Sequence, residues 1–316
     1  RNAVNGIVDD PTSSPTEVPE LPNAPVILAP VMDAALQHDG TAALHAYDWL
    51  LKEDESGILD DWTTTEWQIV QRYVAAFLFY TLGGPNGWNH CFASDSPSPS
   101  DDFLNTTSEC EWNTIIPFTF TEGDPLPENE RGNITVAGIQ CNRQGKINRL
   151  QLPQLDVTGR IPYEVISFFL PALEVLDFIS CLSLSNQPLG SELGMLTNLS
   201  IIYLAYVDQS GSIPTELGLL TNLVSVRLNG NSITGSIPSE LGLITAVERF
   251  GVGINQLAAS IPSELGRWTS VRNAQFFENS LTGSIPSELG LWTSIKRFDI
   301  SGNQLVGSIP SELGKW

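Results

Sequence analysis

Paired carboxylates and histidines are the residues of this chain best suited to chemistry. Asp9–Asp10, Asp60–Asp61 and Asp101–Asp102 are each adjacent in sequence, whereas hydrolysis of a glycosidic bond needs two carboxyl groups at a defined separation across a cleft. His38 and His45 lie near carboxylates, but their spacing matches no metal-binding pattern, and we interpret both as surface residues. Motifs for acyl transfer, zinc proteolysis and phosphate binding do not occur in the sequence. We therefore expect no catalytic residues, no metal ligands and no cofactor.

Four cysteines offer a second kind of chemistry. Cys91, Cys110, Cys141 and Cys181 allow three complete sets of disulfides, and the sequence does not exclude a bond between Cys91 and Cys181. A buried thiol at Cys181 is the alternative, because this residue, three positions after Phe178, belongs to the part of its repeat where an asparagine or cysteine is buried in the turn.

The charge balance excludes two classes of partner. The chain of 316 residues has 36 Asp and Glu residues against 15 Lys and Arg residues, and its formal net charge is −21. Nucleic acids and anionic membrane surfaces both require clustered basic residues, so we expect neither as a partner. No apolar run approaches the ~20 residues that cross a membrane, so we expect no direct membrane insertion by this segment. A signal peptide, or any membrane anchor, is expected to lie outside the sequence, which begins with Arg rather than Met.

An internal repeat indicates which secondary-structure elements the chain forms. The motif Gly-Ser-Ile-Pro-Ser-Glu-Leu-Gly recurs almost unchanged at a fixed period of 24 residues, which is typical of solenoids. Upstream of the motif, alternating apolar residues such as Val226 and Leu228 indicate a short strand with one buried face. One repeat cannot bury its apolar side chains, but stacked repeats share a continuous core. The prolines of the motif are Pro214, Pro238, Pro262, Pro286 and Pro310.

An asparagine follows most of these strands at the same period. Its buried amide is expected to bond to backbone groups in the turn where the sheet ladder stops. Val207 takes this position in one repeat, so that turn should rely on other partners. Ala258–Ala259 replace the usual Thr-Gly of another turn, which should stiffen or shift it. The ladder asparagines are Asn231, Asn255, Asn279 and Asn303.

These features resemble plant-type extracellular leucine-rich repeats, a class that includes receptor-like and polygalacturonase-inhibitor-like proteins and diatom surface proteins. The resemblance covers residues 147–316 continuously. It implies an α/β solenoid, a right-handed superhelix of about seven repeats, the last one incomplete, with a parallel β-sheet on its concave face. It also implies a helical N-terminal cap that carries a disulfide.

The chain is expected to divide into three parts. Residues 1–61, which are acidic and rich in Pro, Ser and Thr, should form an arm or linker. Residues 62–146 should form the N-terminal cap, and residues 147–316 the repeats. Within the cap, Thr63 and Glu66 match a capping box at the start of a helix that should cover the open end of the solenoid.

The cap motif carries the disulfide expectation. Cys110-Glu-Trp and Gly-Ile-Gln-Cys141 resemble the cap of the plant-type repeats, and this resemblance implies a bond between Cys110 and Cys141. Three sequons, at Asn105, Asn133 and Asn198, are candidate glycosylation sites. Together with the cap cysteines they favour an extracellular or cell-surface location reached by the secretory pathway.

The concave sheet is the expected binding surface, because strand alternation turns every second side chain outward from it. We expect it to bind a protein, a peptide or a glycan, as a receptor-like recognition module would. The alternative is a structural subunit of an extracellular assembly or filament that contacts copies of itself or neighbouring subunits, and an ice-binding repeat protein is a further, weaker alternative. The candidate ligand-binding residues are Tyr203, Arg227, Asn229, Arg249, Gln275, Phe277, Arg297 and Asp299.

Overall fold

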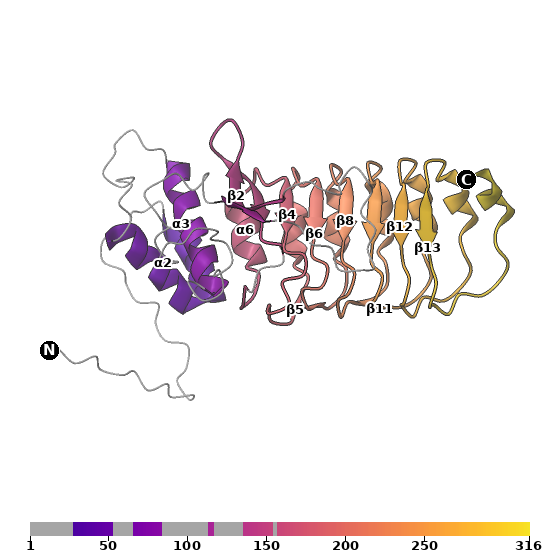
Figure 1. The fold of residues 1–316 in the computed structure, drawn as a ribbon, viewed down its shortest axis with the longest axis horizontal. Coiled ribbons are helices and arrows are strands. Elements are labelled where there is room, and N and C mark those ends of the chain that lie inside the picture. Colours follow the sequence, from indigo (N-terminus) through magenta and orange to yellow (C-terminus); the bar gives the residue numbers. More distant parts are fainter. Residues whose placement is uncertain (1–27, 53–65, 84–112, 117–134, 154–156) are drawn as a thin grey trace, which may run out of the picture.

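The computed structural model describes residues 28–52, 66–83, 113–116, 135–153 and 157–316. These residues form an elongated molecule in which helices cover the N-terminal end of a stack of repeats (Figure 1). The stack continues to the C-terminus at the other end.

A sheet of parallel strands runs along the stack, as the repeat period predicts. In register, Arg249 of one strand faces Ser225 and Asn273 of its neighbours, so equivalent residues of successive repeats form continuous rows. Within the described residues this sheet has nine strands, in the order β1-β2-β3-β4-β6-β8-β10-β12-β13. The repeat strands are β3 (Ile147–Gln151), β4 (Val175–Asp177), β6 (Ile201–Tyr203), β8 (Ser225–Arg227), β10 (Arg249–Gly251), β12 (Asn273–Gln275) and β13 (Arg297–Asp299).

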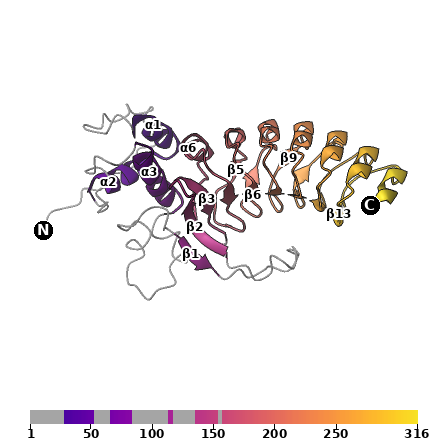
Figure 2. The ribbon, with the colours of Figure 1, turned by 90° about the horizontal axis from the view of Figure 1, so that it is seen from above.

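Short helices form the opposite, convex side of the stack (Figure 2). From η4 onward, each (Ser/Thr)-Glu-Leu-Gly motif forms a 3₁₀ helix that begins after the motif proline, whose fixed φ suits an extended approach to a helix, whereas η3 begins after Gly190. Two further pairs of short strands lie in the connecting turns, β5 (Gln187–Pro188) with β7 (Gln209–Ser210), and β9 (Thr234–Gly235) with β11 (Gln256–Leu257). The convex helices are α6 (Tyr163–Phe169), η3 (Ser191–Met195), η4 (Thr215–Leu219), η5 (Ser239–Leu243), η6 (Ser263–Arg267), η7 (Ser287–Leu291) and η8 (Ser311–Lys315).

The core lies between the sheet and the convex helices. The middle residue of a repeat strand points into it, as Ile202 and Phe250 do, and the leucines of the convex helices meet it from the other side. One hydrophobic cluster therefore runs through the repeats and the cap, which is the arrangement that stacked repeats require.

The ladder asparagines bond to backbone groups of two neighbouring repeats. Asn255 donates from Nδ2 to the carbonyl oxygens of Leu228 (2.9 Å) and Val252 (3.1 Å), while its Oδ1 accepts from the N–H of Ile233 (3.0 Å). Asn231, Asn279 and Asn303 make corresponding bonds. The amide thus supplies partners to polar groups that the strands leave unpaired at the turn.

In the repeat that has Val207 at the ladder position, the amide residue and the apolar residue have swapped places. Gln209 lies two positions later, where other repeats have an aliphatic residue, and it is completely buried. Its Nε2 donates to the carbonyl oxygen of Val207 (3.4 Å), and its Oε1 accepts from the hydroxyl of Tyr163 (2.6 Å). The Oδ1 of Asn231, in the next repeat, accepts from both Val207 N–H and Gln209 N–H. These are the other partners on which this turn relies.

The turn at Ala258–Ala259 keeps its place in the stack, so the expected shift is wrong. Ala259 takes a φ of +65°, close to the +77° and +75° of Gly235 and Gly283 at the same position of neighbouring repeats. The backbone bonds between repeats persist on both sides, from Ala258 N–H to the oxygen of Gly235 and from Thr282 N–H to that of Ala259. Stacking therefore holds a non-glycine residue in the left-handed region, at a cost of about 1 kcal/mol.

The N-terminal cap combines helices with two antiparallel strands. Helices α1 (Ala29–His38), α2 (Gly40–Lys52) and α3 (Glu66–Thr81) pack together and against α6. Strand β2 (Thr135–Cys141) pairs antiparallel with β3, and β1 (Asn113–Ile116) pairs with β2. The side chain of Gln71 on α3 ties the cap to the first repeat, because its Oε1 accepts from Ile147 N–H (2.7 Å). The predicted helix over the open end of the solenoid is therefore present.

The cap also extends into sequence that was expected to be an arm. Helices α1 and α2 fall within residues 1–61, yet Val31, Ala43 and Ala46 belong to the common core. Their small and aliphatic side chains let the two helices pack closely on α3. Residues 1–27, which contain most of the prolines of the arm, lie outside the described residues.

Candidate ligand-binding face

The concave sheet surface carries three parallel rows of outward side chains. The first row contains Arg249 and Arg297, the second Tyr203, Arg227, Gln275 and Asp299, and the third, just after the strands, Asn229 and Phe277. Strand register fixes these rows, since each residue faces its equivalent one repeat away. All eight predicted ligand-binding residues thus lie on one face of the sheet.

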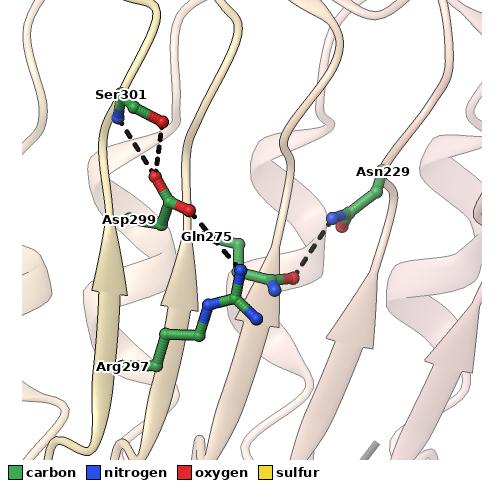
Figure 3. Close-up of polar contacts among 5 residues, drawn as sticks. All are labelled: Asn229, Gln275, Arg297, Asp299 and Ser301. Carbon is green, nitrogen blue, oxygen red and sulfur yellow. Dashed lines mark hydrogen bonds and ion pairs between the residues drawn. The ribbon is translucent and has the colours of Figure 1, made fainter. Parts of the chain in front are cut away.

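Two amide side chains bridge three strands of this face (Figure 3). Asn229 Nδ2, after β8, donates to Gln275 Oε1 on β12 at 3.2 Å, across the intervening strand β10. Gly251 makes the bridge possible, because a Cβ atom there would clash with Asn229 Oδ1. Asn229 and Gln275 are each 5% exposed, and the Oδ1 of Asn229 has no hydrogen-bond partner among the described residues.

Phe277 provides an aromatic surface beside this bridge. Its ring lies directly over Gly253, where a Cβ atom would occupy the position of the ring edge. The ring remains partly exposed. Glycine at 253 therefore leaves room for a large aromatic side chain against the sheet.

Arg297, Asp299 and Ser301 form a polar chain at the last strand (Figure 3). Arg297 contacts the carboxylate of Asp299 at 3.6 Å, and the Ser301 hydroxyl donates to the same carboxylate at 2.7 Å. Burial tends to raise the pKa of Asp299, but the bonds from Ser301 and the charge of Arg297 outweigh it and hold that pKa below its ordinary value. Asp299 is thus a stable anion that offsets part of the charge of Arg297.

Tyr203 and Arg227 form a second aromatic surface nearer the cap. The Arg227 guanidinium lies 4.7 Å from the centre of the Tyr203 ring, a cation–π contact. The hydroxyl of Ser225 donates to the Tyr203 hydroxyl at 3.2 Å. Both side chains are therefore held in place by neighbours on the same face, and such preorganised aromatic and Arg residues are common at binding hot spots.

Asp177 is a residue of this face that the sequence analysis missed. It lies in register with Gln151 and Tyr203 and is 4% exposed. Burial raises its pKa to about 6, against the opposing effects of the Ile179 N–H, the Arg227 charge and Gln151. Alignment of Leu176 with Ile202 would have found it, but the second repeat is 26 residues long and its outward positions were not assigned.

Two of the four cysteines belong to the described residues. Cys141 is in a disulfide, and its partner lies outside those residues, as do Cys91 and Cys110. Cys181 is a buried thiol whose Sγ donates to the carbonyl oxygen of Leu152 (2.8 Å), the bond that a ladder asparagine would make. The alternative of a bond between Cys91 and Cys181 is therefore wrong, and the pairing of Cys110 with Cys141 stays a prediction.

The candidate glycosylation sites are largely outside the described part of the chain. Asn105 and Asn133 fall there. Asn198 is exposed, and its Nδ2 donates to the carbonyl oxygen of Pro171 at 2.9 Å. Its modification stays a prediction.

His38 is not the surface residue that we expected. Its Nδ1 contacts the carboxylate of Glu164 on α6, and its Nε2 lies 3.4 Å from the Arg160 carbonyl oxygen, so it joins the cap to the first repeat. His45 remains exposed and contacts the ring of Tyr80. Among the described residues, no group of three or more His, Cys, Asp or Glu side chains is placed to hold a metal ion. Within the same residues, no helix has the length and apolarity needed to cross a membrane.

Comparison with known proteins agrees with this architecture. A family model of leucine-rich repeats matches residues 222–243 and 294–316. The ectodomain of the Arabidopsis thaliana membrane receptor kinase GASSHO1/SCHENGEN3, solved in complex with CASPARIAN STRIP INTEGRITY FACTOR 2, aligns with a TM-score of 0.53 and 32% identity. The fold of the described residues is therefore that of a leucine-rich-repeat solenoid.

The similarity spans only part of each of these receptor chains. The GASSHO1/SCHENGEN3 alignment covers 60% of this leucine-rich-repeat chain but 22% of the receptor chain. The PEPR1–AtPEP1 complex aligns at 23% identity and a TM-score of 0.46, and the alignment covers 53% of this chain and 26% of the receptor chain. The peptide hormone receptor RGFR1 in complex with RGF2 aligns at 28% identity and a TM-score of 0.47, and the alignment covers 57% of this chain and 35% of the receptor chain. No curated protein sequence gives a significant match.

Proposed function

We propose that this leucine-rich-repeat protein is a non-catalytic, extracellular recognition module that binds an extended peptide or a protein segment on its concave face. The observation that carries the proposal is the preorganised concave surface itself. Tyr203 is held by Arg227, the Phe277 ring packs against a glycine, and the amides of Asn229 and Gln275 are already joined between them.

The composition of this surface suits a peptide. Aromatic faces supply large contact areas at little cost in conformational entropy, while fixed amides offer donors and acceptors to a main chain. Because these side chains are ordered before binding, little rotamer freedom remains to be lost. The receptor ectodomain that aligns at 32% identity was solved in complex with CASPARIAN STRIP INTEGRITY FACTOR 2, which supports recognition of a protein ligand by this type of scaffold.

The convex face has a different character. Its 3₁₀ helices expose a regular row of glutamates, including Glu216 and Glu240, beside exposed aliphatic residues such as Leu219. The row repeats with the solenoid period and lacks the varied aromatic and amide groups of the concave face. It is therefore the natural control surface for a binding experiment.

Affinity selection from a random library of 12-residue peptides tests the proposal. The peptide with the highest affinity for the wild-type chain is synthesised, and its Kd is measured with three proteins: wild type, a concave variant Tyr203→Ala/Phe277→Ala, and a convex variant Glu216→Ala/Leu219→Ala. We expect the concave variant to weaken binding at least tenfold and the convex variant to change it less than twofold. Failure to select any peptide, or equal losses in the two variants, would contradict the proposal.

A further inference from the structure

Four basic residues gather at one edge of the concave face. We call Arg249, Arg272, Lys296 and Arg297 the basic edge. They are four of the nine Arg and Lys residues of the repeats, residues 147–316, in a chain whose net charge is −21. Such a concentration of positive charge in an acidic protein is expected to attract anionic groups.

The repeat geometry places the basic edge over the last three strands. Arg249, Asn273 and Arg297 face one another in register on β10, β12 and β13. Arg272 and Lys296 come directly before β12 and β13, and the Lys296 N–H bonds to the Arg272 carbonyl oxygen at 2.8 Å. The four residues therefore occupy two adjacent positions at the start of these strands.

Two acidic residues offset the basic edge in part. Glu248 contacts Arg272 at 3.7 Å, and Asp299 contacts Arg297 at 3.6 Å. Both contacts are partly exposed to solvent, where an ion pair is weak. Within the described residues the edge carries more basic than acidic side chains, and Arg272 and Lys296 remain exposed.

The spacing along the edge selects the shape of the anionic ligand. Arg249 and Arg297 are separated by one strand, so their backbones lie about 9.6 Å apart at ~4.8 Å per strand. At that separation each arginine can pair with a carboxylate of its own above its own strand. In a polyproline II peptide, residues i and i+3 lie on the same side about 9.3 Å apart, whereas β-strand residues i and i+2 are about 6.8 Å apart. The polyproline II spacing fits the two arginines.

The residue between the two arginines favours a peptide main chain. The Oδ1 of Asn273 is buried and has no hydrogen-bond partner among the described residues. A polyproline II segment makes no internal hydrogen bonds, so any N–H group that it carries is available. A small rotation of the Asn273 amide would let it accept one of them.

We propose that the basic edge binds an acidic peptide in an extended, polyproline II conformation, with acidic side chains at positions i and i+3 over Arg249 and Arg297. This inference rests on the proposed function and adds the charge, spacing and position of the ligand. The acidic part of the peptide lies over the C-terminal strands, and its remainder extends along the concave face toward Phe277 and Tyr203.

Short synthetic peptides test the spacing. The full chain is titrated with a fluorescein-labelled octapeptide PPEPPEPP, with the uncharged PPQPPQPP and with PPEPEPPP, in which the acids are two residues apart. We expect PPEPPEPP to bind at least tenfold tighter than either control and to lose that advantage at 0.5 M salt, where charges are screened. The variant Arg249→Gln/Arg297→Gln should weaken its binding at least tenfold, whereas Arg267→Gln on the convex helix η6 should change it less than twofold.

The outcomes separate this inference from the proposed function. Equal binding of PPEPPEPP and PPEPEPPP overturns the inference, as does a Kd that the Arg249→Gln/Arg297→Gln variant leaves unchanged. A hyaluronan hexasaccharide that binds more tightly than PPEPPEPP also overturns it, because the edge would then prefer an acidic glycan. If the library-selected peptide binds the concave face while PPEPPEPP does not, the inference alone is wrong. If neither binds, the proposed function is wrong as well.

Discussion

At the scale of single residues, two glycines shape the binding face because they have no side chain. Gly251 and Gly253 are on the sheet surface, and the space above them is filled by side chains from neighbouring repeats. The resulting surface is built from Asn229, Gln275 and Phe277 rather than from the strand that lies beneath them. The two glycines are therefore part of the binding site, because they make room for the side chains that form its surface.

The first prediction concerns the amide bridge. Gly251→Ala should displace the Asn229 amide and lose its bond to Gln275, which lowers the free energy of unfolding by about 1 kcal/mol. In an Asn229→Ala background the alanine has room, so the same change should cost close to nothing. Urea unfolding of the four proteins of this cycle measures the difference. Equal costs in both backgrounds would show that the glycine does not act through Asn229.

The second prediction concerns Asp177 and pH. Its pKa is raised to about 6 from an ordinary 3.8, so the folded protein takes up a proton near pH 6 that the unfolded chain takes up only near pH 3.8. This group therefore adds stability as the pH falls from 7 to 4, and the addition is lost as the pH rises through 6. The full shift corresponds to about 3 kcal/mol.

Asp177→Asn should remove this pH dependence, because the amide does not titrate and its oxygen can still accept from the Ile179 N–H. The quantity to measure is the difference in unfolding free energy between wild type and variant at pH 7 and at pH 4.5. The unfolding free energy of the wild type should rise relative to that of the variant at the lower pH. A difference that stays constant with pH would mean that Asp177 titrates normally.

At the scale of elements, each repeat depends on amides contributed by its neighbours. Asn255 serves three carbonyl oxygens and one N–H, in its own repeat and the one before. The corresponding position holds Cys181 or Val207 in the earlier repeats. The Cys181 thiol makes one of the ladder bonds, to the Leu152 carbonyl oxygen, whereas beside Val207 the amide of Gln209 donates to the Val207 carbonyl oxygen instead. The turns thus keep one geometry with three different side chains.

The third prediction tests the ladder. Asn255→Ala leaves several polar groups without partners and should lower the free energy of unfolding by about 3 kcal/mol. Asn222→Ala is the matched control, because Asn222 is exposed and makes one bond, to the Thr197 carbonyl oxygen, and should cost less than about 1 kcal/mol. Similar losses in the two variants, measured by urea unfolding, would contradict the role of the ladder.

The fourth prediction tests the exchanged repeat. Gln209→Leu restores the usual aliphatic residue but leaves the buried Tyr163 hydroxyl without its acceptor, at a cost of about 2 kcal/mol. Adding Tyr163→Phe removes that hydroxyl, so the double variant should be more stable than Gln209→Leu alone. If the second change instead lowers stability further, the 2.6 Å contact is not the reason that the repeat carries a glutamine.

Regular elements were the part of the fold that the sequence predicted well. The period of 24 residues placed each concave position, so Tyr203, Arg227 and Gln275 lie on the expected face. The irregular repeats carry no such period, which is why Asp177 was missed. The contacts of His38 with α6 were unpredictable for a different reason, since they join residues more than 120 positions apart that no local pattern connects.

At the scale of the whole molecule, charge and shape are distributed unequally between the two faces. The convex face repeats glutamates at the solenoid period, whereas the concave face concentrates arginines, aromatic rings and joined amides. Stacking fixes both arrangements, because every outward position recurs one strand spacing away. A peptide that follows the solenoid axis can therefore contact several repeats at once, and its affinity can be distributed over many strands.

The most direct test of this account is to locate a bound peptide by photo-crosslinking. The photoreactive residue p-benzoylphenylalanine is introduced in place of Phe277 on the concave face or, as a control, in place of Leu219 on the convex helix η4, which is 61% exposed. Each protein is irradiated with a biotin-labelled form of the library-selected peptide, and the labelled products are identified by mass spectrometry. We predict a crosslink from position 277 that excess unlabelled peptide abolishes, and none from position 219. A crosslink from position 219 without one from position 277 would contradict the central claim that the concave face is the recognition surface.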